Sequence, residues 1–156
     1  MFEEIFEIDE LAFNAGEESA RILLVDHNAE QGEFIVNKLS RYFRVEVCDN
    51  LGMALLKALE KDYSLLIVNI EVMEIECVEW CIEFKNTSIL KYLPLIVLIN
   101  RNDKKKLEES FRMGAHDYIV MPIDFNELFK RVKVGIRNFK YQEKLRIEYI
   151  KVYITA

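Results

Sequence analysis

Polar residues follow three apolar runs in this chain, at places where α/β proteins often carry out chemistry. Asp26 and His27 come directly after Ile22–Val25, and Asn69 comes directly after Leu65–Val68. A third run, Leu95–Ile99, ends at a further asparagine. A carboxylate, an imidazole and an amide held close together could bind a metal ion or move a proton. Whether they meet depends on the elements that carry them.

The apolar runs are short and do not alternate, which is typical of strands buried on both faces of a parallel sheet. The carboxyl ends of such strands meet at one edge, so Asp26, Asn69 and the end of the third run should converge there. Strands are expected over 21–25, 43–47, 64–69, 94–99 and 116–120, and helices over 29–42, 50–59, 77–85, 103–113 and from 124 onward. Strands and helices in alternation predict a doubly wound α/β domain with a five-stranded parallel sheet.

Several residues mark the ends of these elements. Asp49 or Asn50, then Asp103 and Asp124, stand where helix N-caps are needed, and Gly114 follows the fourth helix, where a left-handed residue is favoured. The Met121–Pro122 bond directly follows the last strand and is a candidate cis peptide.

Composition limits the classes of protein that remain. The chain has 156 residues, about half of them apolar and a net charge of −6; it has no apolar run of membrane-spanning length and no signal peptide. Cys48, Cys77 and Cys81 lack the spacing of a disulfide framework, which favours a reducing compartment and a cytoplasmic location. Cys77 and Cys81 would share a helix face as a metal pair would. No further ligand is near in sequence, which favours two core thiols and no metal.

Charge is distributed unevenly along the chain. Residues 1–20 hold seven acidic and no basic residues, whereas 125–156 hold eight basic and three acidic ones. The two ends could therefore attract each other. The basic end carries no recognisable nucleic-acid-reading motif, so we expect no nucleic-acid partner. A short amphipathic helix is expected near residues 2–14, with 1–20 forming an acidic segment and linker ahead of a domain at 21–138.

The last helix has no stop signal. Phe139, Leu145, Tyr149 and Val152 form a heptad-like apolar stripe along 139–156. A domain ending near residue 138 cannot cover all four, so the stripe predicts a coiled coil and a homodimer. The absence of a cap also indicates a fragment of a longer protein, with the helix leading toward a further domain.

The segments Ile22–His27, Gly114–Tyr118 and Met121–Asp124 resemble those of response-regulator receiver domains. The resemblance covers residues 21 to about 138 and implies the flavodoxin-like strand order 2-1-3-4-5. Active receivers carry an acidic pair after the first strand, a phosphoacceptor Asp after the third, a hydroxyl after the fourth and a Lys before the fifth-strand Pro. Of the family's pattern, only the first acidic residue, Asp26, the switch aromatic, Tyr118, and the Met121–Pro122 peptide remain here. The other positions hold His27, Asn69, Ile99 and Met121.

These replacements remove the requirements of phosphotransfer. An amide is not an anionic nucleophile, a single carboxylate is a poor magnesium cage, and Met121, expected to lie beside Ile99, cannot neutralise phosphoryl charge. We therefore expect a pseudo-receiver with no catalytic residue, metal or cofactor, in which Tyr118 is a fixed packing residue. Asp26 and His27 as a metal site or a catalytic dyad are the rival interpretations. Glu71, Glu74 and Glu76 could recruit a cation, but solvated loop charges are favoured.

A narrower resemblance is to the second, degenerate receiver of PleD-type diguanylate cyclases, carried by Ile67–Asn69, Leu93-Pro94, Pro122–Asp124 and Arg131–Lys133. It implies an adaptor that dimerises and passes a signal to a GGDEF domain making cyclic di-GMP. No GGDEF motif occurs in this chain, so this chain is not itself expected to be an enzyme. The partners implied are a second copy, a neighbouring receiver and the GGDEF domain. An active phosphoacceptor using Asp26 and a stand-alone scaffold are the alternatives.

Overall fold

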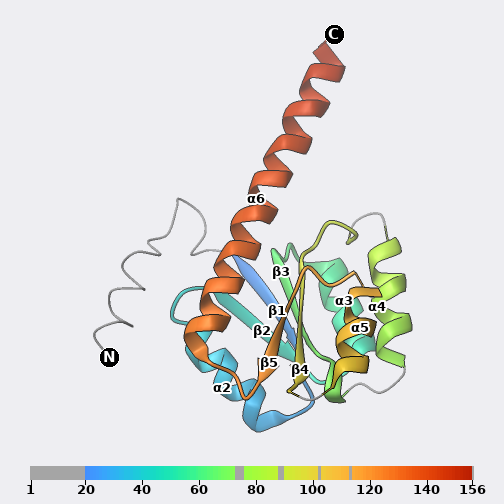
Figure 1. Ribbon diagram of the computed structural model, residues 1–156. Helices are drawn as coiled ribbons and strands as arrows, with labels where there is room; N and C mark the ends of the chain where they lie inside the picture. The colour runs from blue at the N-terminus through green and yellow to red at the C-terminus, as the bar shows by residue number, and fades with distance from the viewer. Residues whose placement is uncertain (1–19, 73–75, 88–89, 102, 113, 156) are drawn as a thin grey trace.

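Five parallel strands form the centre of the protein in the computed structural model, which describes residues 20–72, 76–87, 90–101, 103–112 and 114–155 (Figure 1). The strands are β1 (Arg21–Val25), β2 (Arg44–Cys48), β3 (Leu65–Asn69), β4 (Leu95–Asn100) and β5 (Asp117–Met121). Their order in the sheet is β2-β1-β3-β4-β5, with every neighbouring pair parallel. The predicted doubly wound fold and its strand order are therefore confirmed.

Helices cover both faces of this sheet (Figure 1). The helices are α2 (Ala29–Leu39), α3 (Leu51–Glu60), α4 (Glu76–Asn86), α5 (Lys104–Arg112) and α6 (Phe125–Thr155), with a 3-10 turn, η2 (Ile70–Val72), directly after β3. Successive strand residues point to opposite faces, so each strand contributes to two cores. One core joins the sheet to α3 and α4 and the other joins it to α2 and α6.

The predicted caps hold the helices at their predicted starts. Asn50, and not Asp49, caps α3 by accepting from the Met53 N–H at 2.8 Å. Asp103 accepts from Lys106 N at 3.1 Å and Asp124 from Asn126 N at 2.9 Å. Gly114 has a φ of +84°, as a helix end with a left-handed residue requires.

Boundaries differ from the sequence-based ones by a few residues. The second and fifth strands begin one residue later than predicted, and α2 ends at Leu39 rather than near residue 42. The amide of Ser40 bonds back to Val36 and those of Tyr42 and Phe43 bond back to Leu39, so the backbone turns toward β2 there. The helix predicted near residues 2–14 lies outside the described residues.

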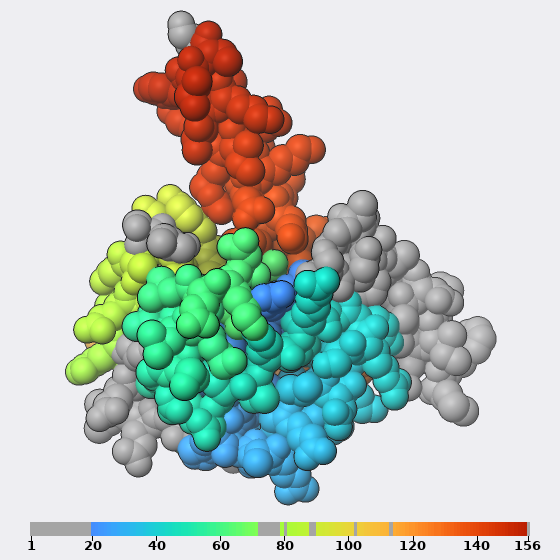
Figure 2. Space-filling view, turned by 180° about the vertical axis from the view of Figure 1, so that it is seen from behind, coloured from blue at the N-terminus to red at the C-terminus, as the bar shows by residue number. Residues whose placement is uncertain are grey.

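Helix α6 is the longest element and has two parts. Its first part lies on the sheet so closely that a Cβ at Gly135 would stand 2.8 Å from Leu65 Cδ1. Its second part projects beyond the amino-terminal edge of the sheet, away from the body of the domain (Figures 1 and 2). Phe139 is half-buried and packs against the domain core. Phe139 is therefore only partly available to the apolar stripe predicted along 139–156.

Candidate functional site

The carboxyl edge of the sheet brings Asp26 and Asn69 into contact. Asp26 directly follows β1 and is 3% exposed, and Asn69 ends β3 at 2% exposed. The Asn69 Nδ2 donates to Asp26 Oδ1 at 3.1 Å, and Asn69 Oδ1 accepts the backbone N–H of Glu71 at 3.0 Å. Both ends of the amide are thereby satisfied, and its orientation is fixed with the N–H toward the carboxylate.

Two further donors complete the surroundings of the Asp26 carboxylate. The backbone N–H of Asn28 reaches Oδ1 at 2.9 Å, and the Gln31 Nε2 reaches Oδ2 at 2.7 Å. Both residues belong to the start of α2, where Asn28 is the N-cap and accepts the Gln31 N–H at 3.1 Å. The three donors and the helix N-terminus stabilise the negative charge of this buried carboxylate. Sequence reasoning missed Asn28 and Gln31, although their N-cap and N3 spacing was a usable signal.

His27 lies apart from this contact. Its side chain is exposed and faces a groove of about 780 Å³ between α2 and α3, where apolar residues mix with polar and charged ones. Within the described residues, no group of three or more His, Cys, Asp or Glu side chains is placed to hold a metal ion. The Asp26 oxygens already accept three donors, and Asn69 presents N–H to them rather than oxygen. These residues do not fit the magnesium ion that active receivers use.

Ile99 and Met121 lie on opposite faces of the sheet. Ile99 is 2% exposed and belongs to the α3–α4 core, while Met121 packs on the α2–α6 core. Ladder pairing explains this, since Ile99 pairs with Val120 and Met121 pairs with Asn100. The expectation that Met121 lies beside Ile99 is therefore wrong. The Met121–Pro122 peptide is cis, as its position directly after a buried strand predicted.

Glu71 occupies the space between β3 and β4. Its Oε1 accepts the backbone N–H of Asn100 at 2.8 Å, and its Oε2 accepts Lys106 Nζ at 2.9 Å. The Glu71 side chain is 11% exposed, and its hydrogen bond raises the pKa of Lys106. The interpretation of Glu71 as a solvated loop charge is wrong, because it ties η2 to β4 and α5. The predictions for Glu74, Glu76 and Cys77 concern side chains outside the described ones.

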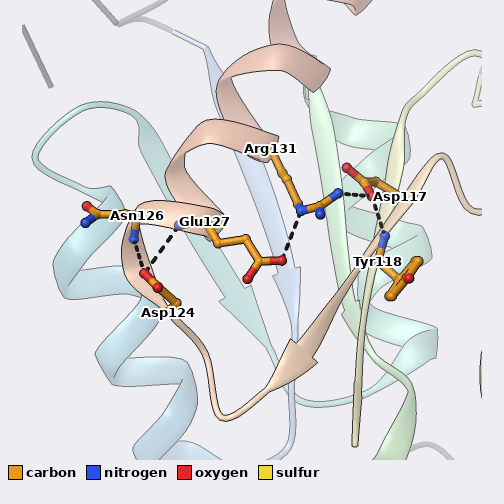
Figure 3. Close-up of polar contacts among 6 residues, drawn as sticks. All are labelled: Asp117, Tyr118, Asp124, Asn126, Glu127 and Arg131. Atoms are coloured by element: carbon orange, nitrogen blue, oxygen red, sulfur yellow. Dashed lines mark hydrogen bonds and ion pairs between the residues drawn. The ribbon is translucent and has the colours of Figure 1, made fainter. Parts of the chain in front are cut away.

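Tyr118 is half-buried in the packing between β5 and α5. Its ring meets Phe111 edge-on, with centroids 6.2 Å apart. Next to it, Asp117 accepts hydrogen bonds from the Tyr118 N–H and from Arg131 of α6, which also pairs with Glu127 (Figure 3). This network joins β5 to α6. The Cys48 thiol is buried and free, and burial raises its pKa to about 11, so it stays a protonated core residue.

Fold and site together define a class: doubly wound α/β modules with a polar cluster at the carboxyl edge of the sheet, bounded by a cis proline. The family model of the response regulator receiver domain matches residues 22–133, and the chain therefore belongs to that family. None of the described helices is both long and apolar enough to cross a membrane.

Similar proteins include a response regulator and a transcriptional regulatory protein. The chain is 25% identical over 126 residues to Response regulator PleD of Caulobacter vibrioides, covering 81% of this chain and 28% of that protein. It is 27% identical over 118 residues to the transcriptional regulatory protein ResD of Bacillus subtilis, covering 75% and 48%. The chain thus spans less than half of either relative.

Solved structures share the fold. A putative response regulator from Chloroflexus aurantiacus matches with a TM-score of 0.72 at 23% identity, covering 76% of this chain and 98% of that one. A structure described as adenylate cyclase from Rhodopirellula baltica matches with a TM-score of 0.74 at 21% identity, covering 85% and 98%.

Proposed function

We propose that this receiver is not phosphorylated and acts as a dimerisation and signal-transmission module. The observation that carries the proposal is the hydrogen bond from Asn69 Nδ2 to the Asp26 carboxylate. Asn69 stands where active receivers hold the phosphoacceptor, and its amide is used as a structural partner of Asp26. The remaining carboxylate is buried behind three donors, which leaves no anionic oxygen free to attack a phosphodonor.

The output that receives the signal is proposed to be a diguanylate cyclase domain outside this chain, in a cytoplasmic protein. Support comes from the PleD relative and from a structural match of TM-score 0.67 described as a receiver-modulated diguanylate cyclase from Pelobacter carbinolicus. The long helix α6, which leaves the domain at its amino-terminal edge, supplies a continuous connection (Figure 1).

Dimerisation is proposed to use a tyrosine stripe on the α6 extension, defined as Tyr141, Leu145, Tyr149 and Val152. Their spacings of four, four and three residues place them on one face, and their exposed fractions run from 45% to 65%. A second copy aligned along this face would bury it.

Phosphodonor labelling tests the first part of the proposal. The purified chain is incubated with acetyl phosphate and Mg²⁺ beside an active receiver, and acyl phosphate is measured by intact mass. We expect no adduct, and no saturable amide shift near Asn69 with millimolar Mg²⁺ or beryllium fluoride. A stable adduct that disappears in Asp26→Asn would overturn the proposal in favour of an active phosphoacceptor.

A further inference from the structure

The α6 extension carries a second apolar stripe that a two-stranded coiled coil leaves uncovered. This isoleucine stripe consists of Ile147, Ile150 and Ile154, spaced by three and four residues. The three side chains are 49%, 54% and 78% exposed. At about 100° per residue, the stripe lies on roughly the opposite side of the helix from the tyrosine stripe. A dimer through one stripe therefore still exposes the other to water.

Positive charge flanks the isoleucine stripe. Lys140, Lys144 and Lys151 lie seven and three residues before and four residues after Ile147, all within about 60° of it around the helix. Within the described residues these three lysines form no ion pair. An occupant of this face should therefore be apolar on one side and acidic at its edges.

The amino-terminal segment of the same chain has that composition. Its apolar residues are interspersed with acidic ones: Phe2, Ile5, Phe6 and Ile8 stand among Glu3, Glu4, Glu7, Asp9 and Glu10. No basic residue occurs before position 21. A helix over 2–13 would be about 18 Å long, close to the length of 142–155 in α6.

The amino-terminal segment joins the domain next to the base of the α6 extension. Ala20 lines a cleft of about 570 Å³ at the base of the extension, together with Phe139, Lys140 and Arg146 of α6. Six residues, 14–19, separate Ala20 from the apolar segment, and they can reach about 20 Å when extended. A segment starting from this base runs back along the extension with residue 13 nearest the domain.

We propose that residues 2–13 lie antiparallel along the isoleucine stripe of their own chain, held by apolar contact and by the flanking lysines. The extension then has two separate faces: one for a second copy and one for its own amino terminus. The inference goes beyond the proposed function and does not require a dimer.

Photo-crosslinking in the full chain tests the arrangement. A benzoylphenylalanine at position 147, 150 or 154 is irradiated, and the captured peptide is identified by mass spectrometry in a mixture of ¹⁵N-labelled and unlabelled chains. We expect capture of 1–13 from the same chain, with position 154 reaching the first residues and position 147 the later ones. The probe at Glu148, about 100° or more around the helix from each isoleucine, is the matched control and should capture several-fold less of 1–13.

Salt and charge variants sharpen the test. High salt and the variant Lys140→Glu/Lys144→Glu/Lys151→Glu should both lower capture of 1–13, because screening and charge reversal remove the attraction. Capture of the second copy's α6 from position 150, or equal capture from positions 148 and 150, would overturn the proposal. A monomeric chain that still captures its own 1–13 would contradict the proposed dimer and leave this inference standing.

Discussion

At the scale of single residues, the amide of Asn69 and the carboxylate of Asp26 form a buried hydrogen bond at the carboxyl edge of the sheet. In Asn69→Asp, a second carboxylate would face the first across about the same 3.1 Å. The lost hydrogen bond and the like-charge repulsion should lower the free energy of unfolding by roughly 1–3 kcal/mol. Chemical denaturation at neutral pH measures this change. Phosphodonor labelling of the variant should still fail, since Ile99 and Met121 supply neither hydroxyl nor ammonium.

Asn69→Ala is the matched control for this substitution, because it removes the amide without adding charge. It should cost less stability than Asn69→Asp at neutral pH, and the difference between the two should shrink in acid as the carboxyls become protonated. Equal stability of the two variants across pH would show that a second carboxylate at this position does not repel Asp26. Efficient labelling of Asn69→Asp would show that phosphotransfer does not require a hydroxyl at Ile99 or an ammonium at Met121.

Lys85 supplies a prediction of pH dependence. Burial lowers its pKa to about 8, and its Nζ donates to the Leu93 carbonyl. Between pH 8 and the ordinary lysine pKa of about 10.4, the unfolded chain binds more protons at this residue than the folded one. The contribution of Lys85 to the free energy of unfolding should therefore rise with pH in that window.

Denaturation of the wild type and of Lys85→Met between pH 7.5 and about 9.5 checks this expectation, in a range below the titration of ordinary tyrosines. The wild-type stability should climb relative to the variant as pH rises. Parallel curves for the two proteins would mean that Lys85 titrates alike in the folded and unfolded states.

At the scale of elements, Gly114 allows the turn between α5 and β5. Its φ of +84° is strained for any residue with a Cβ, and the added atom would meet Lys85 Cγ at 3.4 Å. Gly114→Ala should therefore lower the free energy of unfolding by about 1–2 kcal/mol. Gly52→Ala in α3 is the matched control, since its Cβ meets an Asn50 oxygen at an ordinary 3.5 Å. Thermal melts should show the first variant destabilised and the second unchanged or stabilised.

The elements themselves were accessible from sequence. Buried parallel strands read as unbroken apolar runs, and Asn50, Asp103 and Asp124 marked helix starts by local chemistry that does not depend on the rest of the fold. The end of α2 was misplaced because the helical pattern continues past Leu39, whereas the chain turns there to enter β2.

The site was accessible only in part. The strand ends predicted that Asp26 and Asn69 would meet, which the 3.1 Å contact bears out. The partners of Glu71 were not predicted, because Asn100 and Lys106 come from elements 29 and 35 residues away. Ile99 and Met121 were expected to lie side by side. They do not, because Ile99 is in register with Val120, and successive residues of a strand point to opposite faces of the sheet.

At the scale of the whole molecule, the α6 extension should decide self-association. Leu145→Ser/Tyr149→Ser removes apolar area from the tyrosine stripe at side chains that are 45% and 65% exposed. The domain should stay folded while the dimer dissociates at higher protein concentration, as sedimentation velocity at several concentrations would measure. Lys140→Ser/Lys151→Ser changes positions about 80° or more around the helix from the tyrosine stripe and is the control. Unchanged association in the stripe variant would place the dimer contact elsewhere.

Helix α6 is a single uninterrupted helix from Phe125 to Thr155, seated on the sheet where Gly135 meets Leu65. The rotation of α6 about its axis is therefore fixed inside the domain, and the extension keeps the same orientation. One residue inserted ahead of Tyr141 would swing both stripes by about 100° about the helix axis, whereas seven would return them to within about 20°. Insertions should thus act periodically, with a seven-residue insertion preserving the direction from which a partner approaches and a three- or four-residue one shifting it less than one or two do. The number of residues inserted into the helix therefore sets the angle at which its two stripes face a partner.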